Sequence, residues 1–234
     1  MCEQITTKIL YLAVLPLIAA LSFGCSSSAP IIDTGPDAEV TFDGLHRVKD
    51  SRADEAWARP GLDLSGYSKI KLESAGIEYR PGGEKGRNWR ARSSGGPYEV
   101  TEDQKERLRT ILAEAFREEL GRSNRFTLVK ESGPDVLLIR GGLLDVVSYV
   151  PPQSIGRVDI FLNSVGEATL VLEIRDSITD AILVRAIDRD AAKDIGGTLQ
   201  NSNRVTNAAE VRRLAKRWAS ALRKGLDEFA GPAN

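Results

Sequence analysis

The chain has 234 residues, with 32 lysines and arginines against 33 aspartates and glutamates, so its formal charge is −1. This near balance excludes bulk electrostatic binding of nucleic acid. One histidine and two cysteines leave little material for thiol or histidine-assisted catalysis. The length is compatible with one domain after an N-terminal leader.

Residues 9–23 are uncharged and mostly apolar, and they follow Lys8. This run is shorter than the roughly 20 residues that span a bilayer, so it predicts a signal-peptide core. Gly24 precedes Cys25 in a pattern that resembles the lipobox of bacterial lipoproteins, whose cysteine is acylated and becomes the mature N-terminus. The alternatives are an ordinary cleaved signal with an incidental cysteine and an uncleaved membrane anchor.

The resulting division of the chain is a lipoprotein signal peptide over residues 1–24, an acylated cysteine with a flexible tether over 25–40, and a globular domain over 41–234. The tether is predicted from small, polar and proline-containing sequence. By resemblance to other lipoproteins, Ser26 after the cysteine implies sorting to the outer membrane, facing the periplasm, in a Gram-negative source.

Two amphipathic helices are predicted. The first begins at a capping box, Thr101 to Gln104, and ends at Gly121. The second has a predicted cap at Asn207 and ends before Gly231-Pro232. Both apolar stripes are expected to face the core, and they comprise Leu108, Ile111, Leu112, Ala115, Phe116 and Leu120 in the first, and Val211, Leu214, Trp218, Leu222, Leu226 and Phe229 in the second.

Five strands are predicted, over residues 67–72, 125–129, 136–147, 168–175 and 181–189. Leu170, Leu172 and Ile174 alternate with more polar residues, which is typical of an antiparallel sheet with one buried face. Residues 176–180 are expected to form a hairpin loop, and Gly141-Gly142 a β-bulge. The predicted fold class is a single α+β domain, with a mainly antiparallel sheet of about five strands and two helices on one face.

Four stretches resemble family 3313 of the domains of unknown function, a group of bacterial lipoproteins. They are 42–45 with 59–67, 134–152, 165–170 with 173–176, and the helix 218–227. The resemblance implies a periplasm-facing lipoprotein and adds no activity. Asp180 stands where the family pattern has a glycine in the hairpin.

Two loops are candidate partner-binding sites. Residues 80–97 have a local charge of +4 around Trp89 and include Arg87, Arg90 and Arg92, a combination that suits an anionic partner through forked hydrogen bonds and stacking. The alternative is a solvated loop.

Residues 150–166 form a long predicted connection with the apolar residues Ile160 and Phe161. This apolar tip can either dock a partner protein or fold back over the sheet.

No catalytic, metal or cofactor site is predicted. Asp188, Asp190 and Asp194 lack the spacing of a calcium loop, and Ser164-Val-Gly166 is half of a nucleophile elbow without its first glycine. His46 is the one available histidine base.

The expected function is therefore a non-catalytic interaction or accessory subunit, held in the membrane by acyl chains on Cys25, with an envelope protein as partner and no nucleic acid. The alternatives are a module that binds an envelope polymer, glycan or lipid headgroup, and a small hydrolase acting on cell-wall material.

Overall fold

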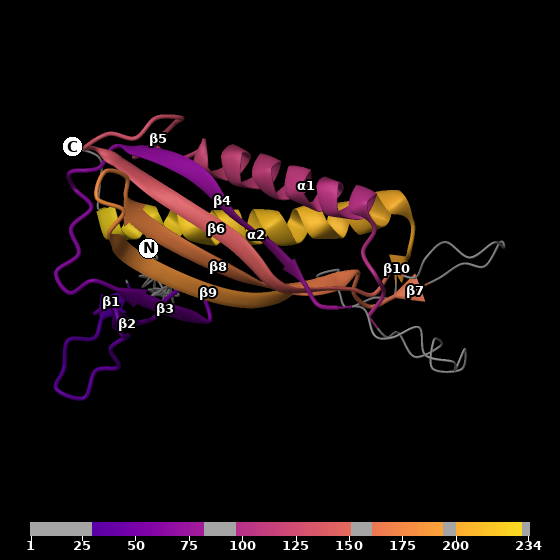
Figure 1. Ribbon diagram of the computed structural model, residues 1–234, viewed down its shortest axis with the longest axis horizontal. Helices are drawn as coiled ribbons and strands as arrows, with labels where there is room; N and C mark the ends of the chain where they lie inside the picture. The colour runs from indigo at the N-terminus through magenta and orange to yellow at the C-terminus, as the bar shows by residue number, and fades with distance from the viewer. Residues whose placement is uncertain (1–29, 82–96, 151–160, 194–199, 231–234) are drawn as a thin grey trace, which may run out of the picture.

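The computed structural model describes residues 30–81, 97–150, 161–193 and 200–230. Eight strands form one sheet in the order β1-β2-β3-β9-β8-β6-β4-β5, and two short strands pair separately as β10-β7 (Figure 1). The strands are β1 (Ile31–Ile32), β2 (His46–Lys49), β3 (Glu55–Ala58), β4 (Lys69–Tyr79), β5 (Thr127–Val129), β6 (Val136–Ser148), β7 (Phe161–Leu162), β8 (Gly166–Asp176), β9 (Ile182–Ala192) and β10 (Gln200–Asn201). The helices are α1 (Glu102–Leu120) and α2 (Arg204–Ala230).

The prediction of about five strands is wrong in number. The five expected strands are present as β4, β5, β6, β8 and β9, and β1, β2 and β3 extend the sheet beyond β9. These added strands are two to four residues long, too short for alternation to reveal them. The sheet is mainly antiparallel, as expected, although β4 pairs in parallel with both β5 and β6.

The predicted bulge lies on a different strand. Gly141 and Gly142 keep an unbroken register with β8, while the extra residue sits opposite them in β4, between Ser74 and Gly76. Gly76 has φ of +105°, a conformation that glycine adopts without a steric penalty. A second irregularity interrupts β6 between Leu144 and Val147.

Both helices cover the same face of the sheet, as predicted. Alternate residues of β8 are buried beneath them, and α2 adds Leu214, Trp218 and Leu226 to the same core. The helices run parallel, with Glu114 bound to Arg212 at 3.1 Å and Glu118 bound to Lys216 at 2.9 Å. Their N-termini therefore lie at the same end of the molecule (Figure 1).

The opposite face of the sheet carries a ladder of ion pairs. Arg185 contacts Glu173 at 3.1 Å and Asp43 at 2.8 Å, and Arg140 contacts Glu73 at 3.0 Å. Such cross-strand pairs match the predicted division of β8 into a buried face and a polar face.

The predicted loop 176–180 connects β8 to β9. The Asp176 carboxylate accepts hydrogen bonds from the amides of Ile178 and Thr179, at 3.0 and 2.7 Å. Asp180 has φ of +57°, in the left-handed region that favours glycine. This conformation explains why a glycine suits that position.

Part of the segment predicted as a flexible tether is a strand. Ile31 pairs with Lys49 and Ile32 with Val48, which fixes β1 to the sheet. Of the two described helices, neither has the length and apolar character of a membrane-spanning segment.

Candidate ligand-binding pocket

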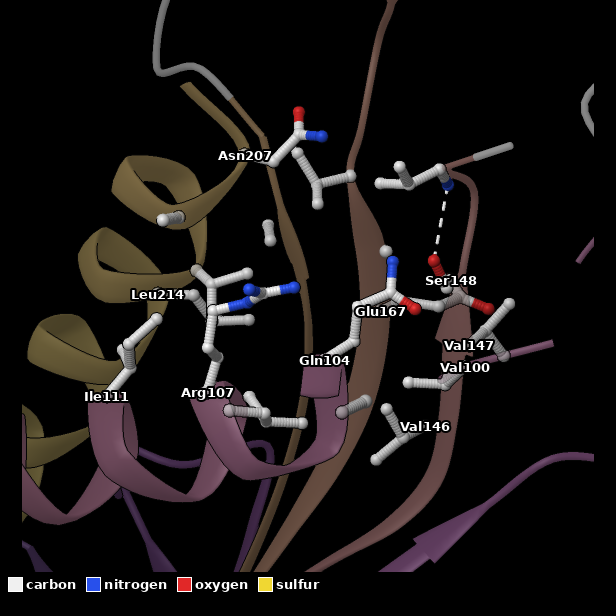
Figure 2. Close-up of a pocket in the computed structure, with 18 of the residues that line it drawn as sticks. Val100, Gln104, Arg107, Ile111, Val146, Val147, Ser148, Glu167, Asn207 and Leu214 are labelled. Atoms are coloured by element: carbon white, nitrogen blue, oxygen red, sulfur yellow. Dashed lines mark hydrogen bonds between the residues drawn. The ribbon is translucent and has the colours of Figure 1, made fainter. Parts of the chain in front are cut away.

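A pocket of about 540 Å³ lies where the first turns of α1 and α2 meet the end of β6 and the start of β8. Figure 2 shows side chains from both helices and both strands pointing into it. Most of its wall is hydrocarbon, contributed by Val100, Leu108, Ile111, Val147, Val211 and Leu214 among others.

The first wall depends on how α1 begins. The predicted capping box is present: the Gln104 amide donates to the Thr101 hydroxyl at 3.3 Å, and the Thr101 amide donates to the Gln104 side chain at 2.8 Å. This cap places Gln104 at the pocket, with Arg107 one turn later. Arg107 pairs with Asp103 at 2.5 Å, so its guanidinium already has an ionic partner.

The second wall depends on how α2 begins, and here the predicted cap is wrong. The helix starts at Arg204, and Asn203 caps it by accepting from the amides of Val205 and Thr206 at 2.9 and 3.0 Å. Asn207 instead lies in the first turn of the helix and faces the pocket (Figure 2). The earlier start brings a further turn of α2 to the pocket.

The sheet side of the pocket requires a glycine. A Cβ on Gly166 would stand 2.2 Å from the Val147 carbonyl oxygen, so no other residue fits without moving β6 or β8. The Ser164 hydroxyl donates to the Gly166 carbonyl at 2.9 Å and accepts from the Gly166 amide at 3.3 Å. The Ser164 side chain therefore holds the start of β8 through hydrogen bonds to backbone atoms.

A four-membered charge cluster borders the pocket. Arg189 contacts Glu167 at 2.8 Å and Asp145 at 3.0 Å, and Arg80 contacts Asp145 at 2.6 Å. These hydrogen bonds, first from Arg80 and then from Arg189, lower the pKa of Asp145 to about 2. Because the cluster joins Arg80, the residue after β4, to β6, β8 and β9, it fixes Glu167 at the edge of the pocket.

Tyr79 supplies the one unusual polar group in the pocket wall. Its hydroxyl is buried and forms no hydrogen bond within the described chain. Burial raises the pKa of this phenol above its ordinary value. The Lys105 ammonium lies 5.2 Å from the ring centre. The Tyr79 hydroxyl is therefore enclosed behind the pocket wall, with no hydrogen-bond partner among the described residues.

Most of the residues predicted for lipidation and for partner binding are not placed. Cys25, Arg87, Trp89, Arg90, Arg92 and Ile160 lie outside the described residues. Phe161 begins β7, pairs with Asn201 of β10, and is 55% exposed.

The residues considered for metal or catalysis have structural partners. The Trp218 indole donates to Asp188 at 2.7 Å, and Arg217 donates to Asp190 at 2.6 Å. Asp194 lies outside the described residues. The Nδ1 atom of His46 lies 2.8 Å from the Asp33 carbonyl oxygen. Across the described ranges, no three histidine, cysteine or acidic side chains group as metal ligands would.

Sequence reasoning missed the pocket because its walls belong to stripes predicted as core. Ile111 and Leu214 have the spacing of core residues, and a sequence pattern does not distinguish a filled core from an open one. The available signal was that the two stripes begin at Leu108 and Val211, well inside their helices, so that smaller or polar residues occupy most of the first turns.

The family model described as "Protein of unknown function (DUF3313)" matches residues 38–222, which is most of the chain. No curated protein matches the chain.

Several solved structures are similar to parts of this chain. A PelC dodecamer from Paraburkholderia phytofirmans is 13% identical, with a TM-score of 0.35, over 72% of this chain and 94% of that chain. Protein XCC0632 from Xanthomonas campestris is 11% identical, with a TM-score of 0.39, over 74% of this chain and 89% of that one. A putative neuraminyllactose-binding hemagglutinin homolog from Helicobacter pylori is 9% identical, with a TM-score of 0.35, over 70% and 84%.

Proposed function

We propose that this chain, which belongs to the family described as "Protein of unknown function (DUF3313)", is a lipid-anchored protein of the bacterial envelope that holds an apolar ligand in the helix-end pocket. In this proposal Cys25 carries the acyl chains and the domain faces the periplasm from the outer membrane. The protein acts as an accessory subunit to an envelope protein and does not transform what it binds.

The pocket is the observation that carries the proposal. Its volume of about 540 Å³ lies within the roughly 300–1,000 Å³ typical of small-molecule sites. Such sites combine an apolar wall with a few polar groups that orient the ligand. Here the polar groups that line the pocket include Gln104, Arg107 and Asn207. This composition favours a hydrocarbon chain with a small polar group at one end.

A binding role without catalysis is supported by what the polar groups already do. Gln104 caps α1, Arg107 pairs with Asp103, and Glu167 pairs with Arg189. Each of these interactions stabilises a wall of the pocket. In this proposal these side chains hold the walls of the pocket rather than exchange protons with a substrate.

The ligand site is tested by reducing the pocket with one side chain. Ala208 lines the pocket on α2, while the next residue, Ala209, is exposed and does not line it. Ala208→Phe places a ring in the space a ligand needs, and Ala209→Phe adds the same ring to the outer side of the helix. The readout is the fluorescence of cis-parinaric acid, an unsaturated fatty acid that emits in apolar surroundings.

We expect saturable binding to the wild type, about tenfold weaker binding to Ala208→Phe, and little change with Ala209→Phe. The tenfold figure corresponds to about 60 Å² of lost apolar contact at about 25 cal/mol per Å². Equal binding by the two variants would place the ligand elsewhere and remove the basis of the proposal.

The anchor is tested separately. The intact mass of protein purified from membranes should equal the chain from Cys25 onward plus acyl groups. Cys25→Ala should abolish that mass, since the acyl acceptor is gone. An unmodified Cys25 in the wild type would refute the anchor while leaving the pocket experiment to stand on its own result.

A further inference from the structure

Phe42 is the most exposed large apolar side chain in the described part of the chain. Its exposed fraction is 97%, and Val40, two residues earlier, is 49% exposed. Both belong to the segment between β1 and β2, which extends from the sheet on the side away from α1 and α2 (Figure 1). We refer to Val40 and Phe42 together as the Phe42 tip.

A tight turn holds the backbone that carries Phe42. The Thr41 amide donates to the Leu45 carbonyl at 2.8 Å, and the Gly44 amide donates to the Thr41 carbonyl at 3.0 Å. The Thr41 hydroxyl accepts from the Leu45 amide at 3.0 Å and donates to the Asp43 carboxylate at 2.6 Å. Leu45 is fully buried at the base of the turn. Phe42 is therefore held in solvent by a folded turn.

An ion pair joins this turn to the sheet. Asp43 contacts Arg185 of β9 at 2.8 Å, and Arg185 also contacts Glu173 of β8 at 3.1 Å. The turn is thus ordered before it meets any partner. Because little further ordering is needed, burying Phe42 against another surface keeps most of the hydrophobic free energy of the side chain.

The charges around the Phe42 tip do not suit an anionic partner. Residues 33–45 contain four acidic residues and no basic residue. Asp37 and Glu39 are exposed and form no ion pair with any described residue. What the tip offers to a partner is apolar area, so the partner that fits it has an apolar interior and needs no negative charge.

The connection to Cys25 limits how far the domain can stand from its anchor. Six residue steps lead from Cys25 to Ile31, and Ile31 is fixed in β1 by its pairing with Lys49. Fully extended, these steps span about 20 Å at 3.3 Å per residue. An acyl anchor on Cys25 therefore keeps Ile31 within about 20 Å of lipid.

The Phe42 tip lies close to this attachment point. Val40 bridges His46, which precedes Lys49 by three residues along β2, a distance of about 10 Å at 3.3 Å per residue. Phe42 is two residues beyond Val40, so it lies within about 17 Å of Ile31. The tip is therefore within reach of the bilayer when the connection is extended, and the bilayer offers the apolar interior that the tip requires.

We propose that the Phe42 tip inserts among the headgroups and upper acyl chains of the membrane that holds Cys25. The inference rests on the acyl anchor of the proposed function. Acyl chains already hold the domain at the bilayer, so insertion of a further apolar side chain is an intramolecular step. Insertion also orients the domain, with the apolar pocket at the end of the helices remote from β1 (Figure 1).

The experiment asks whether position 42 contacts the acyl chains of lipid. The lipidated full-length protein is placed in phosphatidylcholine vesicles whose acyl chains carry bromine, which quenches tryptophan on contact. Phe42→Trp puts a reporter at the tip. Val205→Trp puts the same reporter at a control position, 78% exposed, in the first turn of α2. The three native tryptophans are common to both variants.

We expect bromine to quench the added fluorescence of Phe42→Trp and to leave that of Val205→Trp unchanged. Replacing part of the phosphatidylcholine with phosphatidylglycerol should not increase the quenching, because the contact is apolar and the segment is acidic. Phe42→Ser, read by a reporter at Val40→Trp, should lower the ratio of inserted to free tip about tenfold or more, the factor for burial of one phenylalanine. Val205→Ser should leave that ratio unchanged.

Equal quenching of the two reporters would overturn the proposal, as would quenching that depends on phosphatidylglycerol. The vesicles hold no other protein, so an unquenched Phe42→Trp on an acylated chain would overturn membrane insertion and leave the anchor intact. The mass of the same preparation shows whether Cys25 carries acyl groups. A preparation without them overturns both the anchor and the insertion, because the short connection to lipid would then not exist.

Discussion

Replacing Gly166 is expected to lower the stability of the fold strongly. Gly166 begins β8 beside the end of β6 and borders the pocket. Replacing it with alanine adds a Cβ at 2.2 Å from the Val147 carbonyl oxygen, a contact that must lengthen to at least 3.0 Å. The obstacle is backbone, so no side-chain rotation relieves it.

The cost follows from what must move. Separating the strands here weakens the hydrogen bond that the Tyr149 amide donates to the Val165 carbonyl at 2.9 Å, and it disturbs the backbone pairing at the registered residues Ser148 and Gly166. At about 1 kcal/mol for each of these two interactions plus about 1 kcal/mol of overpacking strain, the loss is about 3 kcal/mol. In a domain of this size that corresponds to a fall in Tm of about 6–12 °C.

Gly225→Ala is the matched control. Gly225 lies within α2, and a Cβ there meets nothing within 4 Å. Alanine stabilises a helix interior by about 1 kcal/mol relative to glycine, so Tm should rise by about 2–4 °C. Thermal unfolding followed by circular dichroism measures both variants. A Gly166→Ala protein as stable as the wild type would refute the close strand contact at the pocket.

Three further predictions concern single groups. Arg80 and Arg189 lower the pKa of Asp145 to about 2, so the contribution of this carboxylate to stability is present above its unfolded pKa near 3.8 and is lost as the pH falls through about 2. The Tm of Asp145→Asn should therefore fall less steeply than that of the wild type over this pH range. A Tm that falls as steeply as in the wild type would contradict the charge cluster. Burial and the hydrogen bond to Asp176 raise the pKa of Tyr67 to about 12, so the contribution of this phenol to stability is present below pH 10 and is lost as the pH rises through about 12. Tyr67→Phe should remove the last step in the tyrosinate absorbance as the pH is raised. An unchanged titration would exclude Tyr67 as the source of that step. Asp180→Gly should stabilise the β8–β9 hairpin by about 0.5 kcal/mol, since φ is +57°, and a loss of stability in urea unfolding would show that the Asp180 contacts outweigh the strain.

The central sheet and both helices were predictable because their patterns are local and long. Alternation at Leu170, Leu172 and Ile174 identified both the strand and its buried face, and these residues are 5 to 7% exposed. The stripe that contains Trp218 was equally clear, and Trp218 is buried against the sheet. In each case several residues in succession repeat the same period, so one exception does not hide the pattern.

The edge of the sheet was not predictable because its strands are short and pair with residues far away in the sequence. β3 has four residues and is held by pairing with β9, where Trp57 lies opposite Arg185, far along the chain. Local sequence does not contain a pairing of that separation. The start of α2 was misplaced because Asn203 and Asn207 are both good caps, and the reciprocal bonds between Asn203 and Thr206 decide in favour of the first.

The pocket, and with it the candidate site, depends on tertiary spacing. Ile111 and Leu214 each belong to a predicted stripe, but the gap between them is set by how the two parallel helices meet the end of the sheet. The concave surface between the β2–β3 turn and α2 likewise joins Arg52 to α2 residues more than 150 positions later. The sequence shows which residue types are present, but it does not show which of them lie side by side in the folded chain.

The most direct test of the account is to map where an apolar ligand binds. A fatty acid with a diazirine on its chain is added to the full-length protein, photolysed, and the modified residues are identified by peptide mass spectrometry. The account predicts labelling within α1 near Ile111, within α2 near Leu214 and on β6 near Val147, reduced by Ala208→Phe and unaffected by Ala209→Phe. Labelling elsewhere on the described surface, or labelling that ignores both substitutions, would contradict the assignment of the helix-end pocket as the ligand site.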